Sequence, residues 1–378
     1  MASIQKMKNG RWRYRVSYKE NGKYKTKTKG GFRTKKEAEL AAAELEKQLH
    51  KGYDINAGDQ LFSEYMRNWY EIFRKGKKSA DNDNDIRRAV EFVEKYFPDV
   101  KLKDLTREMY QKALNEYGET HSTSSVKKHH TYMRACLKEA LADGIIHKDP
   151  TFNAVAVGKV APKDEEIKYL NYEEVAKLLR VTTENLQPRY ISRYIILFAL
   201  ATGARFSEII GLTWNCVDFE NKTVTINKTW DHKYKKGFDN TKNYASKRTI
   251  TVDEHTLSIL KDLKLKQTEL ALKTGLRNEH NLVFVNSKFE LVTNNAVNKT
   301  LRSLCKKAKI KEITCHGLRH THASMLLFKG VNIKYVSRRL GHKDIVTTLQ
   351  TYSHIMDEME QKESRQVDLT MGELYNAK

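Results

Sequence analysis

The first 50 residues alternate between polar and apolar positions and then change to a helical pattern. From residue 10 the sequence GRWRYRVSY places an aromatic or aliphatic residue at every second position, which is the period of a β-strand. Asn21-Gly22 predicts a hairpin turn, and Gly30-Gly31 predicts a second break. The Ala- and Glu-rich stretch 34–50 predicts a helix, with Thr34 and Glu37 as a capping box. We expect two or three strands and one helix in a small domain, residues 1–55.

Residues 60–157 are polar and poor in glycine, and their apolar positions recur at helical spacing. This spacing is clearest at Phe62, Tyr65, Met66, Trp69, Tyr70 and Phe73. Residues 125–146 predict an amphipathic helix that ends near Gly144. The pattern indicates an all-α domain of four or five helices, bounded by linkers at residues 52–58 and around Gly158 and Pro162.

The remainder, residues 165–378, mixes helical and strand patterns and forms a third domain. Residues 223–230 and 247–252 predict strands on either side of a long polar hairpin. Helices are predicted at residues 171–180, 188–202, 255–274, 294–308, 316–329, 333–340 and 344–352. The fold class is therefore multidomain α+β: a small sheet with one helix, an all-α domain, and a mainly α domain with a small antiparallel sheet.

The net charge of the chain indicates what kind of partner it binds. The chain has 69 basic and 47 acidic side chains, a formal net charge of +22. Residues 1–36 contain 13 basic residues and one acidic residue, so more than half of this excess lies in the first domain. Such an excess favours a polyanionic partner, because phosphate contacts dominate nucleic-acid affinity.

Basic residues also recur at every second position of the predicted strands. We expect them to form a cationic ribbon that fits a DNA groove, whereas a merely solvated sheet face is the alternative. The residues are Arg11, Arg13, Arg15, Lys25, Lys27 and Lys29. In the helical domain, Lys127, Lys128 and Arg134 could follow a duplex backbone, and a solvated helix face explains them about as well.

Other classes of protein are disfavoured. The four cysteines are far apart and form no C-x-x-C pair, which indicates a reduced, intracellular setting. The apolar run 195–201 is much shorter than the roughly 18 to 20 residues of a membrane span. The basic N-terminus has no apolar core of a signal peptide, so we expect a cytoplasmic protein.

The stretch HGLRHTHAS, residues 316–324, offers either a metal site or an anion site. His316 and His320 are four residues apart, as in zinc proteases with an H-E-x-x-H motif. Arg319 would share their helix face, and its permanent charge repels a metal cation but attracts a phosphate. No glutamate base and no third ligand accompany the pair, so we expect no metal, and His320 and His322 are interpreted as structural.

Several motifs of the third domain occur in a characteristic order. Arg205 lies in TGARFSEI, Lys242 in NTKNYASKRTI, His316 and Arg319 in HGLR, His342 in LGHK, and Tyr352 in TLQTYSH. This set resembles the tyrosine recombinase family, and within it the integrases of phages and integrative elements that carry an extra N-terminal DNA-binding domain. The resemblance implies the tyrosine recombinase fold, with an arm-type DNA-binding domain, a core-binding domain and a catalytic domain.

The resemblance implies a site-specific recombinase that integrates and excises a mobile element. Tyr352 would attack a phosphodiester and leave a 3′-phosphotyrosyl link. Arg205 and Arg319 would clamp the phosphate, since guanidinium groups bind phosphate oxygens in pairs and do not lose their charge. His316 would accept a proton, and His342 would bond the phosphate. Lys242 would protonate the leaving 5′-oxygen.

Each of these residues also has a simpler interpretation. Arg205 could be a structural partner of Glu208, and Tyr352 could be a core aromatic residue. Lys247 and Arg248 compete with Lys242 for the role of general acid, but Lys242 follows Thr241 as in the family pattern.

The resemblance further implies double-stranded DNA with core and arm attachment sites as the substrate. A homotetramer on DNA, an excision factor and a host DNA-bending protein are the expected partners, and no cofactor is expected. The apolar residues Val367, Leu369, Met371 and Leu374 suggest that the tail docks on a neighbouring protomer, with packing in cis as the alternative.

Three rival functions remain in view. A chromosome or plasmid resolvase of the Xer kind and a nicking-closing topoisomerase would use similar phosphate chemistry. A catalytically inactive DNA-binding regulator represents a different class.

Overall fold

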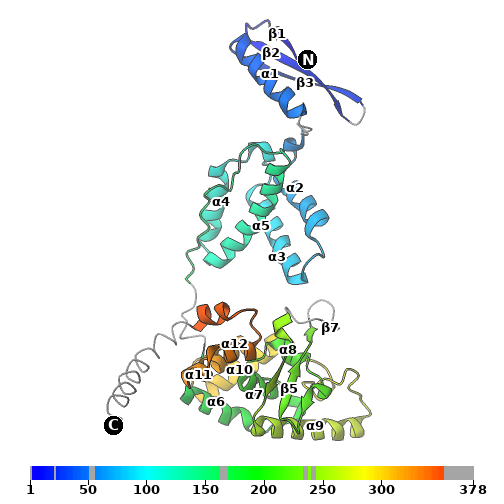
Figure 1. The fold of residues 1–378 in the computed structure, drawn as a ribbon, viewed down its shortest axis with the longest axis vertical. Coiled ribbons are helices and arrows are strands. Elements are labelled where there is room, and N and C mark those ends of the chain that lie inside the picture. Colours follow the sequence, from blue (N-terminus) through cyan, green and yellow to red (C-terminus); the bar gives the residue numbers. More distant parts are fainter. Residues whose placement is uncertain are drawn as a thin grey trace, which may run out of the picture. The chain divides into compact units, whose positions relative to one another are not determined.

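The computed structural model describes residues 2–20, 23–50, 56–161, 169–232, 237–239 and 244–352. The chain divides into two compact units, with the division at residues 162–163. Figure 1 shows the first unit in blue to green and the second in green to red. The predicted mixture of a small sheet, an all-α part and a mainly α part with small sheets is confirmed.

The N-terminal part is a three-stranded antiparallel sheet in the order β1-β2-β3, packed against one helix (Figure 1). Its elements are β1 (Ser3–Lys6), β2 (Trp12–Glu20), β3 (Lys23–Phe32) and α1 (Lys35–His50). Tyr14 and Val16 of β2 are buried together with Ala42 and Leu45 of α1, so the helix covers one face of the sheet. The backbone N–H of Glu37 donates to Thr34 Oγ1 at 3.1 Å, as predicted for the start of α1.

Two expectations for this sheet need comment. The predicted break at Gly30-Gly31 is wrong, because β3 continues through both glycines to Phe32. The strand absorbs an extra residue instead: Trp12 pairs with Phe32 while Arg13 pairs with Gly30, and Gly31 has a φ of +99°. This is a β-bulge, which glycine accommodates without a steric clash. The predicted turn at residues 21–22 lies outside the described residues.

Four α-helices make up the part from residue 56 to residue 161, consistent with the predicted helical bundle. They are α2 (Phe62–Trp69), which continues as a π-helical turn to Arg74, α3 (Ala80–Tyr96), α4 (Arg107–Gly118) and α5 (Thr123–Ala142). Phe62, Met66 and Trp69 belong to its core, whereas Phe73 is half exposed. The helical spacing of the apolar residues therefore identified which face of α2 is buried, but not that this burial ends before Phe73.

The segment after α5 remains attached to this helical part. The Lys159 N–H donates to the Gly118 carbonyl at 2.8 Å, and Gln111 bonds both the N–H and the carbonyl of Val155. At Gly158 a Cβ would lie 2.2 Å from the His121 carbonyl oxygen, so only glycine permits this close backbone approach.

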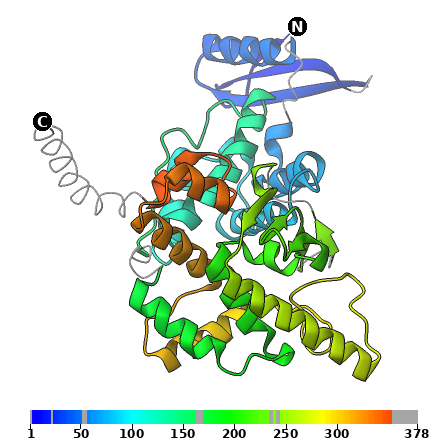
Figure 2. The ribbon, with the colours of Figure 1, turned by 60° about the horizontal axis from the view of Figure 1, so that its bottom comes forward.

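The second unit is organised around α7 (Ile191–Thr202), whose residues are almost all buried. Among the helices that pack against it are α6 (Tyr172–Thr183), α10 (Asn294–Ala308) and α11 (Cys315–Phe328). Figure 2 shows α9 (Glu254–Thr274) as a long helix beside them. Further helices are α12 (Ile333–Leu340) and the short α8 (Phe206–Ile210), and residues 345–352 are also helical. All predicted helices of this unit are found, whereas α8 was not predicted.

Two small sheets accompany these helices. One has the order β4-β5-β8 and the other pairs β6 with β7, all antiparallel. The strands are β4 (Val217–Asp218), β5 (Thr223–Ile226), β6 (Thr229–Asp231), β7 (Gly237–Asp239) and β8 (Arg248–Thr251). The predicted strands thus pair with each other, and the polar hairpin between them includes Lys242, which lies outside the described residues.

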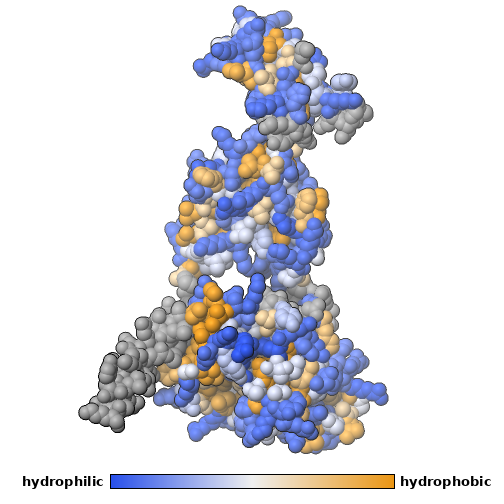
Figure 3. All heavy atoms as spheres, viewed as in Figure 1, coloured by the Kyte–Doolittle hydropathy of each residue, from blue (hydrophilic) through white to orange (hydrophobic). Residues whose placement is uncertain are grey.

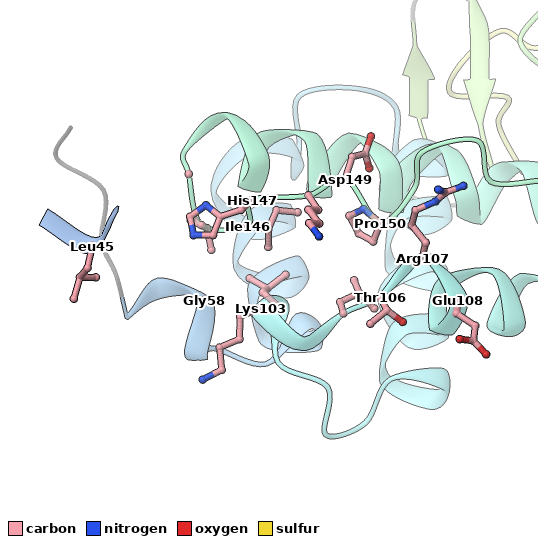
Figure 4. A pocket seen from close by; sticks show the side chains of 15 residues that line it. Leu45, Gly58, Lys103, Thr106, Arg107, Glu108, Ile146, His147, Asp149 and Pro150 are labelled. Atoms are coloured by element: carbon pink, nitrogen blue, oxygen red, sulfur yellow. The ribbon is translucent and has the colours of Figure 1, made fainter. Parts of the chain in front are cut away.

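The surface is mainly hydrophilic, with scattered apolar residues, in the face that Figure 3 shows. In the described part of the chain, no helix has both the length and the apolar character that crossing a membrane requires. The first unit contains a pocket of about 700 Å³ (Figure 4). Lys103, Arg107, His147 and Asp149 are among the residues that line it, and none of the predicted site residues is. The predicted chemistry must therefore be sought elsewhere.

Candidate active site

Helix α11 carries the histidine-rich motif and begins at its N-cap Thr314, whose hydroxyl accepts from the Gly317 N–H. The helical spacing places His316, Arg319 and His320 on one face of the helix. The rings of His316 and His320 meet edge to face, with their centroids 4.7 Å apart. The motif is thus ordered by a helix cap and by packing of α11 on α7.

Arg319 is the most deeply buried cation of this motif, with 3% of its surface exposed. Its NH1 donates to the Gly203 carbonyl at 2.7 Å, whereas its NH2 is buried and has no hydrogen-bond partner among the described residues. Burial and the charge of Arg205 lower the pKa of Arg319 to about 9, which is still above neutral pH. A charged donor that lacks a partner in the interior favours an anionic ligand.

Arg205 lies at the N-cap of α8 and faces the same region. Its NH1 donates to Glu208 at 2.8 Å, and its NH2 donates to the Gly341 carbonyl at 3.1 Å. The simpler interpretation of Arg205, a structural pair with Glu208, is therefore correct as far as it goes. It does not exclude a role in binding, because Arg205 also acts electrostatically on Arg319, His316 and His342.

Glu208 and Arg248 complete this charge cluster and were not among the predicted site residues. Glu208 is 2% exposed and also accepts from Arg248 NH2 at 2.9 Å. Burial opposes the ionised carboxylate, but the charge of Arg248 and hydrogen bonds from Arg248 and Arg205 outweigh it and lower the pKa of Glu208. The spacing of Arg205 and Glu208, three residues apart, had indicated their pairing as the structural alternative for Arg205. Arg248 had been considered only as an alternative to Lys242 for the general acid, and its ion pair with Glu208 was not predicted.

The two remaining predicted histidines are neutral at pH 7. Burial, followed by the charges of Arg319 and Arg205, lowers the pKa of His342 to about 4 and also lowers the pKa of His316. The Nδ1 atom of His342 is bonded to the Thr348 hydroxyl at 2.7 Å. Both rings can therefore form hydrogen bonds without adding to the positive charge of the cluster.

Tyr352 is buried at the end of the last described helix, with 2% of its surface exposed. Its hydroxyl is bonded to Nδ1 of His320 at 3.0 Å, and its charge acts on Arg319. Sequence reasoning treated His320 as a structural residue and did not foresee this contact. The structure thus places Arg205, His316, Arg319, His342 and Tyr352 in one neighbourhood.

Lys242, the predicted general acid, lies outside the described residues. The chain that follows it returns to the site at Ser246, whose carbonyl accepts from Arg248 NH1 at 2.8 Å. The Ser246 hydroxyl lies 3.5 Å from Arg205 NH1. Ser246 and Arg248, which follow Lys242 in the sequence, therefore belong to the charge cluster.

His322 is held by two hydrogen bonds within the fold and is structural. Its Nε2 accepts from Arg339 at 3.0 Å, so its Nδ1 carries the proton and donates to the Leu200 carbonyl at 2.9 Å. No group of three metal-binding side chains occurs among the residues for which positions are described.

With this geometry established, comparison with known proteins is informative. Residues 168–359 match the phage integrase family. The chain belongs to the phage integrase family. Residues 3–49 match the arm DNA-binding domain, and residues 61–154 match the SAM-like domain of phage integrases.

Curated relatives of this family member are similar over nearly their whole length. A tyrosine recombinase XerC-like protein from Caldanaerobacter subterraneus is 27% identical, over 93% of this chain and 94% of the relative. The integrase of Staphylococcus phage L54a is 26% identical, over 84% and 96%. The ICEBs1 integrase of Bacillus subtilis is 23% identical, over 97% and 99%.

Solved structures show the fold that this family member shares with other integrases. The Tn1549 transposon integrase in complex with transposon right end DNA has a TM-score of 0.64 at 19% identity, covering 80% of this chain and 99% of that one. A lambda integrase dimer bound to a core site has a TM-score of 0.59 at 17% identity, covering 92% and 93%. The predicted tyrosine recombinase fold is confirmed.

The predicted DNA-binding residues of the N-terminal sheet do not form a single ribbon. Arg13 and Arg15 pair with Gly30 and Thr28, so they lie on the open face of the sheet. Lys25, Lys27 and Lys29 pair with Tyr18, Val16 and Tyr14, on the face that α1 covers. Strand pairing explains this separation. The arginines recur at every second position of β2 and the lysines at every second position of β3, but the pairing register places the two sets on opposite faces of the sheet.

The other predicted DNA-binding residues are at the surface. Arg11 precedes β2 and is exposed. On α5, Lys127, Lys128 and Arg134 are exposed, and Lys128 forms an ion pair with Asp85 at 2.9 Å. Lys25 and Lys29 are also exposed, whereas Lys27 is partly buried and donates to Asn56 at 2.9 Å.

We expect Glu208→Gln to destabilise the second unit by about 3 kcal/mol, because it leaves the buried Arg248 and the partly buried Arg205 without a counter-charge. Urea unfolding would measure this change. Glu254→Gln is the matched control, since it removes one charge from an exposed ion pair with Lys222 and should change stability little. Equal effects of both substitutions would contradict a special role for the buried carboxylate.

Acid should destabilise the protein partly through His322. Burial and then Arg339 lower its pKa to about 3, so below about pH 6.5 the unfolded chain binds a proton that the folded chain does not. The contribution of His322 to the free energy of unfolding should be fully present above about pH 7. It should fall by up to about 1.4 kcal/mol per pH unit as the pH drops below 6.5. His322→Gln, which cannot titrate, should flatten this fall in urea unfolding at pH 7.5 and 5. An unchanged slope would assign the acid sensitivity to other groups.

Proposed function

We propose that the chain is an integrase of a mobile element, a tyrosine-type site-specific DNA recombinase that cleaves and rejoins double-stranded DNA. One observation carries the proposal: the buried guanidinium of Arg319 has an unpartnered NH2 beside Arg205, and Tyr352 lies in the same charge cluster. This arrangement suits a single phosphodiester and a phenol nucleophile. The net charge of +22 fits a nucleic-acid substrate.

Phosphate chemistry explains the choice of residues. Attack by the Tyr352 oxygen adds negative charge to the non-bridging oxygens, and preorganised cations lower the barrier to that change. Arg205 and Arg319 would bind these oxygens, since guanidinium groups form paired, charge-assisted hydrogen bonds with phosphate. His316 and His342, neutral before the substrate arrives, would donate further hydrogen bonds. The products are a 3′-phosphotyrosyl link and a free 5′-hydroxyl.

Lys242 is the proposed general acid for the leaving 5′-oxygen. Ser246 and Arg248, four and six residues after Lys242, belong to the charge cluster, which supports this proposal. The link to tyrosine conserves the energy of the phosphodiester bond, so the proposed reaction uses neither ATP nor a metal ion.

We propose three domains with separate DNA contacts: residues 1–55 for arm sites, residues 60–157 for the core site, and residues 165–378 for catalysis. The open face of the N-terminal sheet, with Arg13 and Arg15, is the best candidate for the arm-site contact. On α5, Lys127, Lys128 and Arg134 are available for the backbone of the core site. In the bacterial cell the protein would act at the nucleoid.

Strand exchange requires four active sites on two duplexes, so we propose a homotetramer on DNA. A lambda integrase tetramer bound to a Holliday junction, which has a TM-score of 0.57 to this chain at 17% identity, offers a precedent for such an assembly. An excision factor and a host DNA-bending protein are proposed partners. The proposed docking of residues 367–374 on a neighbour falls outside the described residues.

A resolvase of the Xer kind is the second candidate, since the first relative above bears that name. The two functions differ in their DNA: an integrase joins two different attachment sites, whereas a resolvase acts on two copies of one site. Recombination assays with DNA that flanks the gene would separate them.

Tyr352→Phe should abolish covalent attachment to a nicked suicide duplex that carries the core site. The substitution removes only the hydroxyl, so DNA binding should persist in a mobility-shift assay. Denaturing gel electrophoresis would measure the adduct. An adduct that survives Tyr352→Phe would refute the assignment, and a wild-type protein that binds the site without any adduct would indicate a regulator.

Arg13→Ala with Arg15→Ala should weaken binding to arm-site DNA. Each lost phosphate contact should lower the slope of log affinity against log salt by about 0.9. Lys36→Ala with Lys47→Ala is the matched control, because it removes the same charge from exposed positions on α1. Footprinting on DNA flanking the gene would identify the site, and titrations at several salt concentrations would give the slopes. Equal slopes for both double variants would exclude the open face as the contact.

A further inference from the structure

The hydrogen bond between His320 and Tyr352 joins two residues that are 32 positions apart in the sequence. Nδ1 of His320 lies 3.0 Å from the Tyr352 hydroxyl oxygen, and the two ring centroids are 5.7 Å apart. His320 lies one turn after His316 on α11, and residues 345–352 bring the tyrosine back against that helix.

The chemistry of the two groups defines what this bond can do. A neutral imidazole that carries its proton on Nε2 has a lone pair on Nδ1, which accepts the phenolic proton. Because Tyr352 is buried, bulk water has little access to its hydroxyl, so a base must be within direct reach. His320 is in that position before DNA arrives.

Resting on the function proposed above, we propose that His320 is the catalytic base that accepts the phenolic proton of Tyr352 as this residue attacks the DNA phosphate. The Tyr352 oxygen forms a bond to phosphorus while its proton moves to His320 Nδ1. The bond from phosphorus to the 5′-oxygen breaks, and that oxygen takes a proton from Lys242. In the second step the 5′-hydroxyl of another strand attacks phosphorus and gives its proton to Lys242, while the bond from phosphorus to Tyr352 breaks and His320 returns its proton to the tyrosine oxygen.

This assignment moves the base from His316, where sequence reasoning put it, to the residue four positions later. The electrostatic neighbours of His316 are the two clamp arginines, Arg319 and Arg205. It is thus better situated to donate to the phosphate. His320 then accepts the proton of the nucleophile, and His316, one helical turn earlier, donates a hydrogen bond to the phosphate.

Charged and titratable groups face His320 from each element around it. His316 and Arg319 share α11, His342 follows α12, and Tyr352 ends the last helix. The positive charge of Arg319 favours the phenolate form of Tyr352, so the proton transfer and the clamp act in the same direction. Any pH profile therefore reports the coupled set, and variants of single residues are needed to isolate His320.

The test measures the single-turnover rate at which the full chain forms the covalent adduct. Two suicide duplexes that differ only in the leaving group are compared. One duplex has the normal 5′-oxygen, and the other has a bridging 5′-sulfur, which leaves without a proton. His320→Ala should slow both reactions about 10²-fold, because its defect lies in the nucleophile. Lys242→Ala should slow only the reaction of the 5′-oxygen duplex.

A conservative variant separates proton transfer from positioning. His320→Asn keeps an oxygen that can accept a hydrogen bond from Tyr352 but cannot take its proton, so it should remain about as slow as His320→Ala. Free imidazole should partly restore the rate of His320→Ala, in proportion to the neutral form of the added base.

Ser324→Ala is the control for folding, since it removes an unpartnered hydroxyl one turn further along α11 and should leave the rate unchanged. Urea unfolding and DNA affinity, measured for all variants, identify any that are misfolded.

Three results would overturn the proposal. A wild-type rate in His320→Ala would show that the base is elsewhere. A faster rate would show that the bond holds the nucleophile back. Full activity in His320→Asn would reduce His320 to a positioning residue. In each case the wild-type adduct still forms, so the recombinase function survives; only a wild-type protein that forms no adduct would defeat both.

Discussion

The charge cluster of the second unit contains more positive than negative charge. Arg205, Arg248 and Arg319 all interact with one buried carboxylate, that of Glu208, which forms direct hydrogen bonds with only the first two. Burying unpaired charge is costly, and the rest of the domain must supply the stability that tolerates it. A phosphodiester would provide the missing charge. The cluster therefore forms before the substrate binds, and its uncompensated positive charge favours an anionic substrate.

Backbone carbonyls at two helix ends hold the clamp in place. Gly203 ends α7 and Gly341 ends α12, both in the left-handed conformation that glycine adopts without strain. The Gly203 carbonyl accepts from Arg319, and the Gly341 carbonyl accepts from Arg205. A Cβ at Gly203 would come within 2.8 Å of His322, so the tight packing that positions the carbonyl also excludes larger residues. The positions of the arginines thus follow from the ends of buried helices rather than from loops.

The same excess of positive charge governs the histidines. His316 and His342 stay neutral because burial and the nearby arginines both oppose another cation. A neutral ring can donate or accept one hydrogen bond per nitrogen, which makes it adaptable to a substrate whose charge grows during the reaction. The arrangement separates two tasks: the arginines supply charge, and the histidines supply hydrogen bonds and move protons.

The sequence by itself determined the local structure and the list of reactive residues. The periodicity of residues 294–308 and 333–340 predicted α10 and α12 at the bounds that the structure has, because these segments contain complete helical signals. Only the tertiary structure decided which side chains meet. Register placed Lys25, Lys27 and Lys29 on the covered face of the sheet, opposite the arginines, and long-range packing put His320 rather than His316 on Tyr352. The reason is physical: local spacing fixes the direction of a side chain on its own element, whereas contacts between distant elements depend on how their surfaces pack.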